Sequence, residues 1–186
     1  MLLLVAPSSV ESLHAQASVK IGNLNVGVVQ SPRFSLEGGK KKSASKKVWL
    51  EAEVVFQVSS SKPPKDGYLP DALEVEIFVV VNAGREKKLI THKGTYANVA
   101  VGESQTVAVY LPPREFARLI GKDKPSKGDV VGYAVNITYA GKSVAADLKG
   151  IKKEAMDQSP EMEMVSRSKT PFRDLFYDSY LVDSEG

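Results

Sequence analysis

Apolar residues alternate with polar ones over much of the first 150 positions, and this period of two constrains the fold more than any other feature. Between Val48 and Val58 every second residue is apolar, and Glu51, Glu53 and Gln57 lie between them. Successive side chains of a strand point to opposite faces. The pattern therefore predicts a strand with one buried face and one face in water, as antiparallel sheets have.

The same reasoning predicts seven strands. They are residues 19–30, 48–58, 73–81, 89–93, 105–111, 130–139 and 142–148. Gly22 and Gly27 favour a bulge or bend in the first strand. Seven short strands within about 130 residues predict an all-β sandwich of two packed sheets.

One short helix is expected between the fifth and sixth strands. Prolines open the segment 112–120 and Gly121 closes it, which is the usual asymmetry of helix ends. Phe116, Leu119 and Ile120 recur at helical spacing, so this face should pack against the sandwich.

The N-terminus resembles the end of a signal peptide. Residues 2–6 are apolar, and Ala15-Gln16-Ala17 has the small-x-small pattern of a cleavage site. We expect residues 1–17 to be a signal-peptide remnant, and the protein to reach the periplasm, outer membrane or cell surface. The alternative is a disordered N-terminus of a cytoplasmic protein. No later stretch has the ~20 apolar residues of a membrane-spanning helix.

Residues that usually carry catalysis are scarce. The chain has no cysteine, and its two histidines are His14 and His92. We expect His92 to be a surface residue, and no phosphate loop, hydrolase elbow or zinc motif is present. The glutamates at 51, 53, 74 and 76 alternate on strand faces that we expect to be wet. The sequence predicts no enzyme activity, no cofactor and no metal site.

Five lysines crowd the loop between the first two strands. They are Lys40, Lys41, Lys42, Lys46 and Lys47. Such a cluster can hold an anionic surface, although a solvated loop that blunts a sheet edge is the plainer interpretation. The cluster lacks interleaved aromatic residues and the net charge is only +3, so no nucleic-acid partner is expected.

The segment 151–186 is first polar and then aromatic, and Met162 and Met164 alternate with glutamates in its polar part. Its aromatic part has the spacing of a short amphipathic helix. We predict that this part binds a protein partner or a second copy of the chain. The predicted contact residues are Phe172, Leu175, Phe176 and Tyr180. The alternative is that the segment folds back on its own sandwich.

Asp129, Tyr133 and Val135 have the spacing of the Asp, Tyr and Cys of immunoglobulin F strands. Residues 19–148 thus resemble an immunoglobulin-like sandwich of the disulfide-free bacterial kind, because Val135 stands at the cysteine position. In that family the tyrosine forms a tyrosine corner. The resemblance therefore implies a buried Tyr133 ring, with its hydroxyl bonded to backbone upstream of Asp129.

The whole chain also resembles small exported immunoglobulin-like proteins encoded with type IV pilus components in mucus-dwelling bacteria. The signal remnant 1–17, the sandwich 18–150 and the extension 151–186 together carry this resemblance. It implies a non-catalytic structural or interaction protein of the cell envelope, an accessory of type IV pili that could form homo-oligomers. The alternative is a carbohydrate-binding module for mucin or another glycan. Its stacking residues would be Trp49, Tyr68 and Tyr96.

Overall fold

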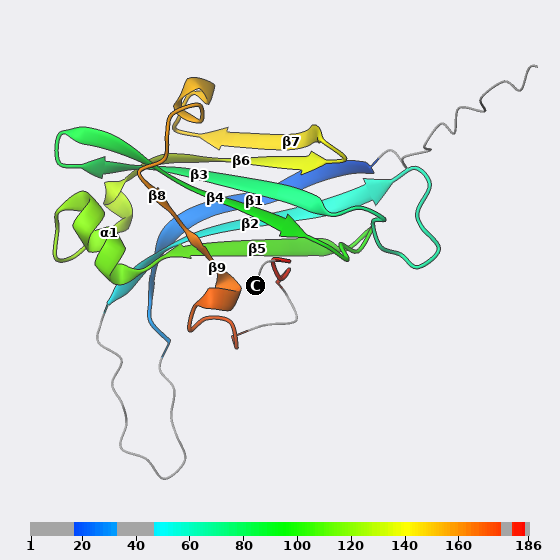
Figure 1. The fold of residues 1–186 in the computed structure, drawn as a ribbon, viewed down its shortest axis with the longest axis horizontal. Helices are drawn as coiled ribbons and strands as arrows, with labels where there is room; N and C mark the ends of the chain where they lie inside the picture. Colours follow the sequence, from blue (N-terminus) through cyan, green and yellow to red (C-terminus); the bar gives the residue numbers. More distant parts are fainter. Residues whose placement is uncertain (1–16, 33–46, 176–179, 185–186) are drawn as a thin grey trace, which may run out of the picture.

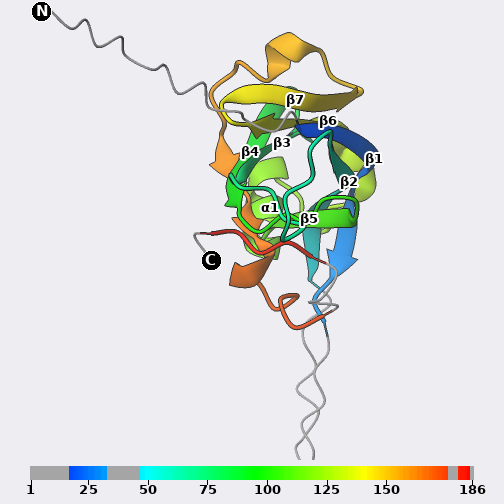
Figure 2. The same cartoon turned by 90° about the vertical axis from the view of Figure 1, so that its right-hand side faces the viewer.

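The structure is a computed structural model that describes residues 17–32, 47–175 and 180–184. Nine strands in this part of the chain form two stacked sheets (Figures 1 and 2). The strands are β1 (Ala17–Gln30), β2 (Val48–Ser60), β3 (Leu73–Ala83), β4 (Glu86–Tyr96), β5 (Ser104–Leu111), β6 (Val130–Tyr139), β7 (Lys142–Lys149), β8 (Met162–Glu163) and β9 (Val165–Ser166). One sheet has the order β1-β2-β5-β9, and the other has the order β7-β6-β3-β4-β8.

The predicted all-β architecture is correct, but the predicted number of strands is wrong. The first seven strands lie at the predicted places, and β4 extends beyond the predicted 89–93 at both ends. The two additional strands, β8 and β9, lie in the predicted C-terminal extension. Each has only two residues, which is too short to produce a convincing period of two.

The core lies between the two sheets and consists of the residues that alternation placed inside. The inward side chains of β2 and β3 are almost wholly buried. Gly22 lies at a register shift between Ile21 and Asn23, where β1 pairs with β2. This irregularity is the bulge expected in the first strand.

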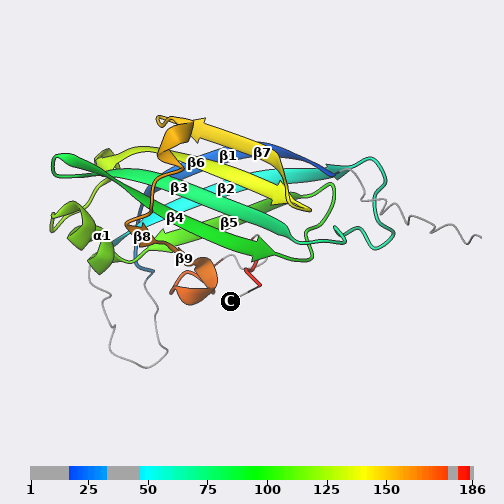
Figure 3. The ribbon, with the colours of Figure 1, turned by 45° about the horizontal axis from the view of Figure 1, so that its top comes forward.

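Helix α1 (Pro113–Ile120) covers one end of the sandwich and contacts both β2 and β3 (Figure 3). Phe116, Leu119 and Ile120 are buried, as their spacing predicted. Gly121 ends the helix with a φ of 68°, a left-handed conformation that glycine adopts without strain. Within the described ranges, no helix is long and apolar enough to cross a membrane.

The beginning of β6 differs from the expected tyrosine corner. The Tyr133 ring is only half-buried, and the Lys149 Nζ lies 5.9 Å from its centroid. The buried polar group here is instead Asp129, whose carboxylate accepts hydrogen bonds from the backbone N–H and hydroxyl of Ser126 at 2.9 and 3.1 Å. Asp129 also pairs with Lys122.

The two long edges of the sandwich are closed in different ways. At one edge β1 contacts β7, and Lys149 Nζ donates a hydrogen bond of 2.9 Å to the Leu24 carbonyl. At the other edge β4 of one sheet lies across from β5 of the other, and we call this edge the seam. The seam is bridged by the C-terminal residues 162–175 and 180–184, which we call the strap (Figure 1).

The strap first crosses the seam through β8 and β9. Strand β8 pairs in parallel with β4, and β9 pairs antiparallel with β5. Met164 lies between these two strands. Its backbone N–H donates a hydrogen bond of 2.7 Å to the Thr91 carbonyl, and its side chain is buried in the core. The strap is therefore part of the fold.

Replacing Met164 by alanine tests this conclusion. Met164→Ala removes a buried side chain at the seam, so the free energy of unfolding should fall by about 2–5 kcal/mol. Chemical denaturation measures the change. Met156→Ala is the matched control, because Met156 lies in the same C-terminal part but is only half-buried and outside the core. Equal unfolding midpoints for the two variants would contradict the role given to Met164.

Candidate functional site

The strap turns sharply after β9 and does not form the predicted aromatic helix. A 3₁₀ turn (Arg167–Lys169) is followed by turns through residue 175. The Thr170 hydroxyl donates a hydrogen bond of 2.8 Å to the Arg167 carbonyl and accepts one of 3.2 Å from the Phe172 N–H. A threonine that bonds nearby backbone groups in this way stabilises a turn in competition with a helix.

Phe172 packs on the outer face of the sheet that contains β2 and β5. Its ring stacks on Tyr110 of β5, with centroids 4.5 Å apart, and meets Trp49 of β2 edge-on at 5.5 Å. The Trp49 indole N–H donates a hydrogen bond of 2.9 Å to the Ser31 hydroxyl. Phe172 is thus buried against the sandwich, which is the alternative that the sequence left open.

Tyr180 also contacts the sandwich. Its hydroxyl donates a hydrogen bond of 2.9 Å to Glu53 Oε2, and burial with this bond raises the pKa of Tyr180 to about 12. Leu175, by contrast, is 36% exposed. Phe176 lies outside the described residues, so the structure places three of the four predicted contact residues.

The glutamates on the outer face of β2 are less solvated than expected. Burial raises the pKa of Glu51, a hydrogen bond with Tyr110 opposes this rise, and the nearby charge of Glu53 adds to it. On β3, Glu74 and Glu76 instead share Lys93, whose Nζ lies 2.9 and 3.6 Å from their carboxylates. The aromatic residues of the strap thus cover one glutamate pair and leave the other at the surface.

The strap crosses the seam a second time near its end. The Leu181 N–H donates a hydrogen bond of 2.8 Å to the Thr106 carbonyl of β5. The Ser184 N–H donates a bond of the same length to the Thr95 carbonyl of β4. Because these two bonds hold the chain on both sides of the seam, Asp183 is directed into it.

Asp183 meets a buried polar cluster on β4. His92 Nε2 lies 3.6 Å from Asp183 Oδ2, and His92 Nδ1 lies 3.0 Å from the Met164 carbonyl, within hydrogen-bond distance. A Cβ atom built on Gly94 would lie 2.8 Å from Asp183 Oδ2, His92 Nε2 and the Tyr96 hydroxyl. Burial, together with the Asp183 charge, raises the pKa of Tyr96. Three polar groups therefore converge on the space that glycine leaves open.

The expectation that His92 is a surface residue was wrong. His92 is 8% exposed, because it lies opposite Ile77 on the inward face of β4 and is covered by Met164 and Asp183 of the strap. Alternation shows which residues share a face, but the strap covers this face from a distant part of the chain. His14 lies outside the described residues, as do residues 1–16 of the predicted signal remnant.

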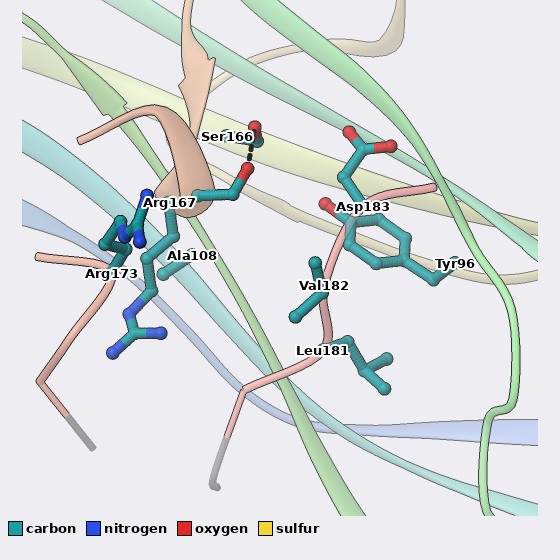
Figure 4. Close-up of a pocket in the computed structure, with 9 residues that line it drawn as sticks. Tyr96, Ala108, Ser166, Arg167, Arg173, Leu181, Val182 and Asp183 are labelled. Atoms are coloured by element: carbon teal, nitrogen blue, oxygen red, sulfur yellow. Dashed lines mark hydrogen bonds between the residues drawn. The ribbon is translucent and has the colours of Figure 1, made fainter. Parts of the chain in front are cut away.

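A pocket of ≈ 260 Å³ lies between the two crossings of the strap (Figure 4). Arg167, Ser168 and Arg173 line it from the outgoing part of the strap, and Val182 and Asp183 from the returning part. Figure 4 shows the two arginines on one side and Asp183 on the other, with its carboxylate turned away from them. The pocket thus has a basic side that the Asp183 carboxylate does not neutralise.

Arg167 is the unusual residue of this pocket. It is 8% exposed, and its Nη2 atom has no hydrogen-bond partner among the described residues. Its guanidinium carbon lies 4.2 Å from the centre of the Tyr180 ring, a cation–π contact. Val182, which is 64% exposed, lines this pocket. Leu175, which is 36% exposed, lies two residues after the lining residue Arg173 in the sequence.

This site was not predicted from the sequence, because residues 151–169 have the composition of a polar spacer. The one available signal was the alternation of Met162 and Met164 with glutamates, which is the pattern of a short strand. Nothing in the sequence indicated that Arg167 would be buried or that Asp183 would reach His92. Both placements depend on contacts between residues far apart in the chain.

The other predicted ligand sites are dispersed. Tyr96 is buried and Trp49 is packed between rings, so of the three aromatic residues proposed to stack on sugars only Tyr68, at 47%, is largely exposed. Of the predicted anionic-surface lysines, Lys47 is exposed, and the other four lie outside the described residues. The described residues contain no group of three or more potential metal ligands.

Comparison with known proteins places this chain in a family. A protein-family model matches residues 10–185. The chain belongs to that family. A crystal structure of a protein from Akkermansia muciniphila is similar, with a TM-score of 0.77 and 28% sequence identity over 90% of this chain and 93% of that one. Among proteins with curated descriptions, none matches significantly.

Replacing Gly94 by alanine tests the polar cluster. The new methyl group would be too close to Asp183, His92 and Tyr96, so we expect Gly94→Ala to displace the end of the strap and to cost about 1–3 kcal/mol of stability. Hydrogen exchange of the Ser184 amide should become faster. In the control Gly27→Ala, the Cβ has no neighbour within 4 Å. An unchanged Ser184 exchange rate in the Gly94 variant would refute the arrangement.

Proposed function

We propose that this protein is exported and acts in the cell envelope as a non-catalytic interaction protein, an accessory of type IV pili built on an immunoglobulin-like sandwich. Two facing sheets, antiparallel except where β8 pairs with β4, support the proposed fold type. The similar structure comes from Akkermansia muciniphila, a mucus-dwelling bacterium, which agrees with the resemblance to proteins of such organisms. The specific role rests on the surface of the strap.

The observation that carries the proposal is the combination of an apolar rim and a basic pocket on the strap. Val182 and Leu175 are exposed, whereas most large apolar residues of the described chain are not. Arg173 lines the pocket and lies two residues from Leu175. Apolar side chains beside arginine are typical of the centres of protein interfaces. The strap thus offers a contact surface while it holds the sandwich closed.

The placement of His92 supports a role without catalysis. A general base must reach the proton that it removes, and histidine is the usual base near neutral pH. His92 is buried at the seam between the Met164 carbonyl and Asp183. A substrate could reach it only after the strap had moved away. We therefore propose that the His92–Asp183 pair serves to position the strap.

The carbohydrate-binding alternative has less support. A sugar ring can stack on an aromatic side chain only where one face of that side chain is exposed to solvent. Tyr96 and Trp49 are committed to contacts within the protein, which leaves Tyr68 as the exposed residue of the three. One exposed tyrosine is a small platform, so glycan binding is not the function that we propose.

Export predicts a defined N-terminus. Protein purified from the native envelope should begin at Ser18, because cleavage after Ala17 follows the small-x-small pattern. N-terminal sequencing of the envelope and cytosolic fractions measures this. Replacing Ala15 and Ala17 by leucine should block cleavage and leave a longer chain. A native chain that begins at Met1 and is found in the cytosol would contradict the export proposal.

The interaction role predicts where a partner touches the protein. A photo-crosslinking amino acid at position 182 should capture a pilus or other envelope protein in living cells. The matched control is position 148, because Leu148 is an exposed apolar residue on β7, away from the strap. Crosslinking at 182 and not at 148 would support the proposal. Equal capture at both positions, or none, would count against the strap as the contact surface.

A further inference from the structure

The pocket beneath the strap contains a buried charge without a counter-ion in the described structure. Arg167 is 8% exposed, and its Nη2 is unpaired among those residues. Arginine remains protonated in proteins, so the site cannot avoid the cost of burial by losing the proton. A buried charge normally has a paired partner. The Tyr180 ring supplies partial compensation, and Nη2 is left without a hydrogen-bond partner among the described residues.

Four acidic residues around this pocket in the described part of the chain have other partners. Glu53 accepts the hydrogen bond from Tyr180, and Glu51 bonds Tyr110. Asp183 lies on the opposite wall beside His92, with its carboxylate directed away from Arg167 (Figure 4). Asp174 pairs with Arg173 at 3.2 Å, at the exposed surface. None of these four carboxylates pairs with Arg167 in the described structure, so the basic side of the pocket can accept another anion.

The shape and lining of the pocket restrict the kind of anion. Its volume of ≈ 260 Å³ suits a small group, and Ala108, Leu181 and Val182 give it apolar walls. The Ser168 hydroxyl is already bonded to Ser166 at 2.9 Å, which leaves few donors for a ligand with many hydroxyl groups. A carboxylate matches the planar fork of arginine. The apolar walls favour a carboxylate that is attached to an apolar group.

We propose that this pocket binds a carboxylate of a protein partner, presented next to an apolar side chain, with Arg167 as the principal ligand and Arg173 as a second cation at the mouth. The proposal rests on the interaction role proposed above and names the chemistry of the partner. The carboxylate enters between the outgoing and returning parts of the strap. The apolar neighbour packs against Val182 at the rim.

The direct test uses N-acetyl-leucine and its neutral amide as probes. Binding to the full chain is measured by NMR from the arginine side-chain Nε–H signals. The acid should shift the Arg167 signal in a saturable manner, and the amide should not. Arg167→Gln should weaken binding about tenfold or more, because one charge-assisted contact is lost. Arg85→Gln is the control, since Arg85 is exposed in the β3–β4 turn and lines none of the described pockets.

A second variant distinguishes a loss of binding from a loss of folded structure. Arg173 is well exposed, so Arg173→Gln should leave the melting temperature unchanged and still weaken binding of the acid. Arg167→Lys keeps the charge but loses the planar fork, and it should bind less tightly than the native chain. If the acid and the amide bind alike, or if neither arginine variant changes the affinity, the proposal fails.

Two further outcomes would overturn the proposal in specific ways. Tighter binding of N-acetylneuraminic acid than of N-acetyl-leucine would identify the ligand as an acidic sugar. Binding that is seen only after Asp178→Asn would mean that the chain supplies its own carboxylate. Neither result would affect the export test or the crosslinking test, so a failure of this inference is distinguishable from a failure of the proposed function.

Discussion

The closure of the seam is the constraint on which the rest of the structure depends. Edge strands carry unpaired backbone groups, and β4 and β5 would both expose such groups at the same side of the sandwich. The strap bonds to both strands at each of its two crossings. At the first crossing it buries Met164, and at the second it directs Asp183 toward His92. Backbone pairing, core packing and the polar cluster at the seam therefore all depend on the same segment.

The strap also determines which polar side chains are buried. His92 and Arg167 are both nearly inaccessible, and both meet a group that the strap supplies. For His92 that group is Asp183, and for Arg167 it is the ring of Tyr180. Buried polar groups are costly unless they are satisfied, so each contact fixes the path of the strap more narrowly than apolar packing alone would. The Phe172 ring, stacked on Tyr110, holds the turns that follow β9 against the outer face of the sheet that contains β2 and β5.

Most of the sandwich could be predicted because it follows from local periodicity. The alternation in β2 and β3 identifies both the strands and their inward residues, and prolines and Gly121 identify α1. The strap could not be predicted in the same way. Its strands have two residues each, and its aromatic part has helical spacing although Thr170 stabilises a turn. The burial of His92 depends in part on Asp183, which is far away in the sequence. Local sequence patterns do not indicate contacts between such distant residues.

The order of the strap in the chain has a consequence for biosynthesis. The ribosome makes strands β1 to β7 before it makes residues 162–184, so the seam between β4 and β5 has no segment to close it until those residues have been synthesised. Until then the buried Met164 side chain and the backbone bonds of the strap are missing, so the two sheets lack part of their core and both edge strands remain open. Complete folding of the sandwich therefore cannot precede synthesis of the strap.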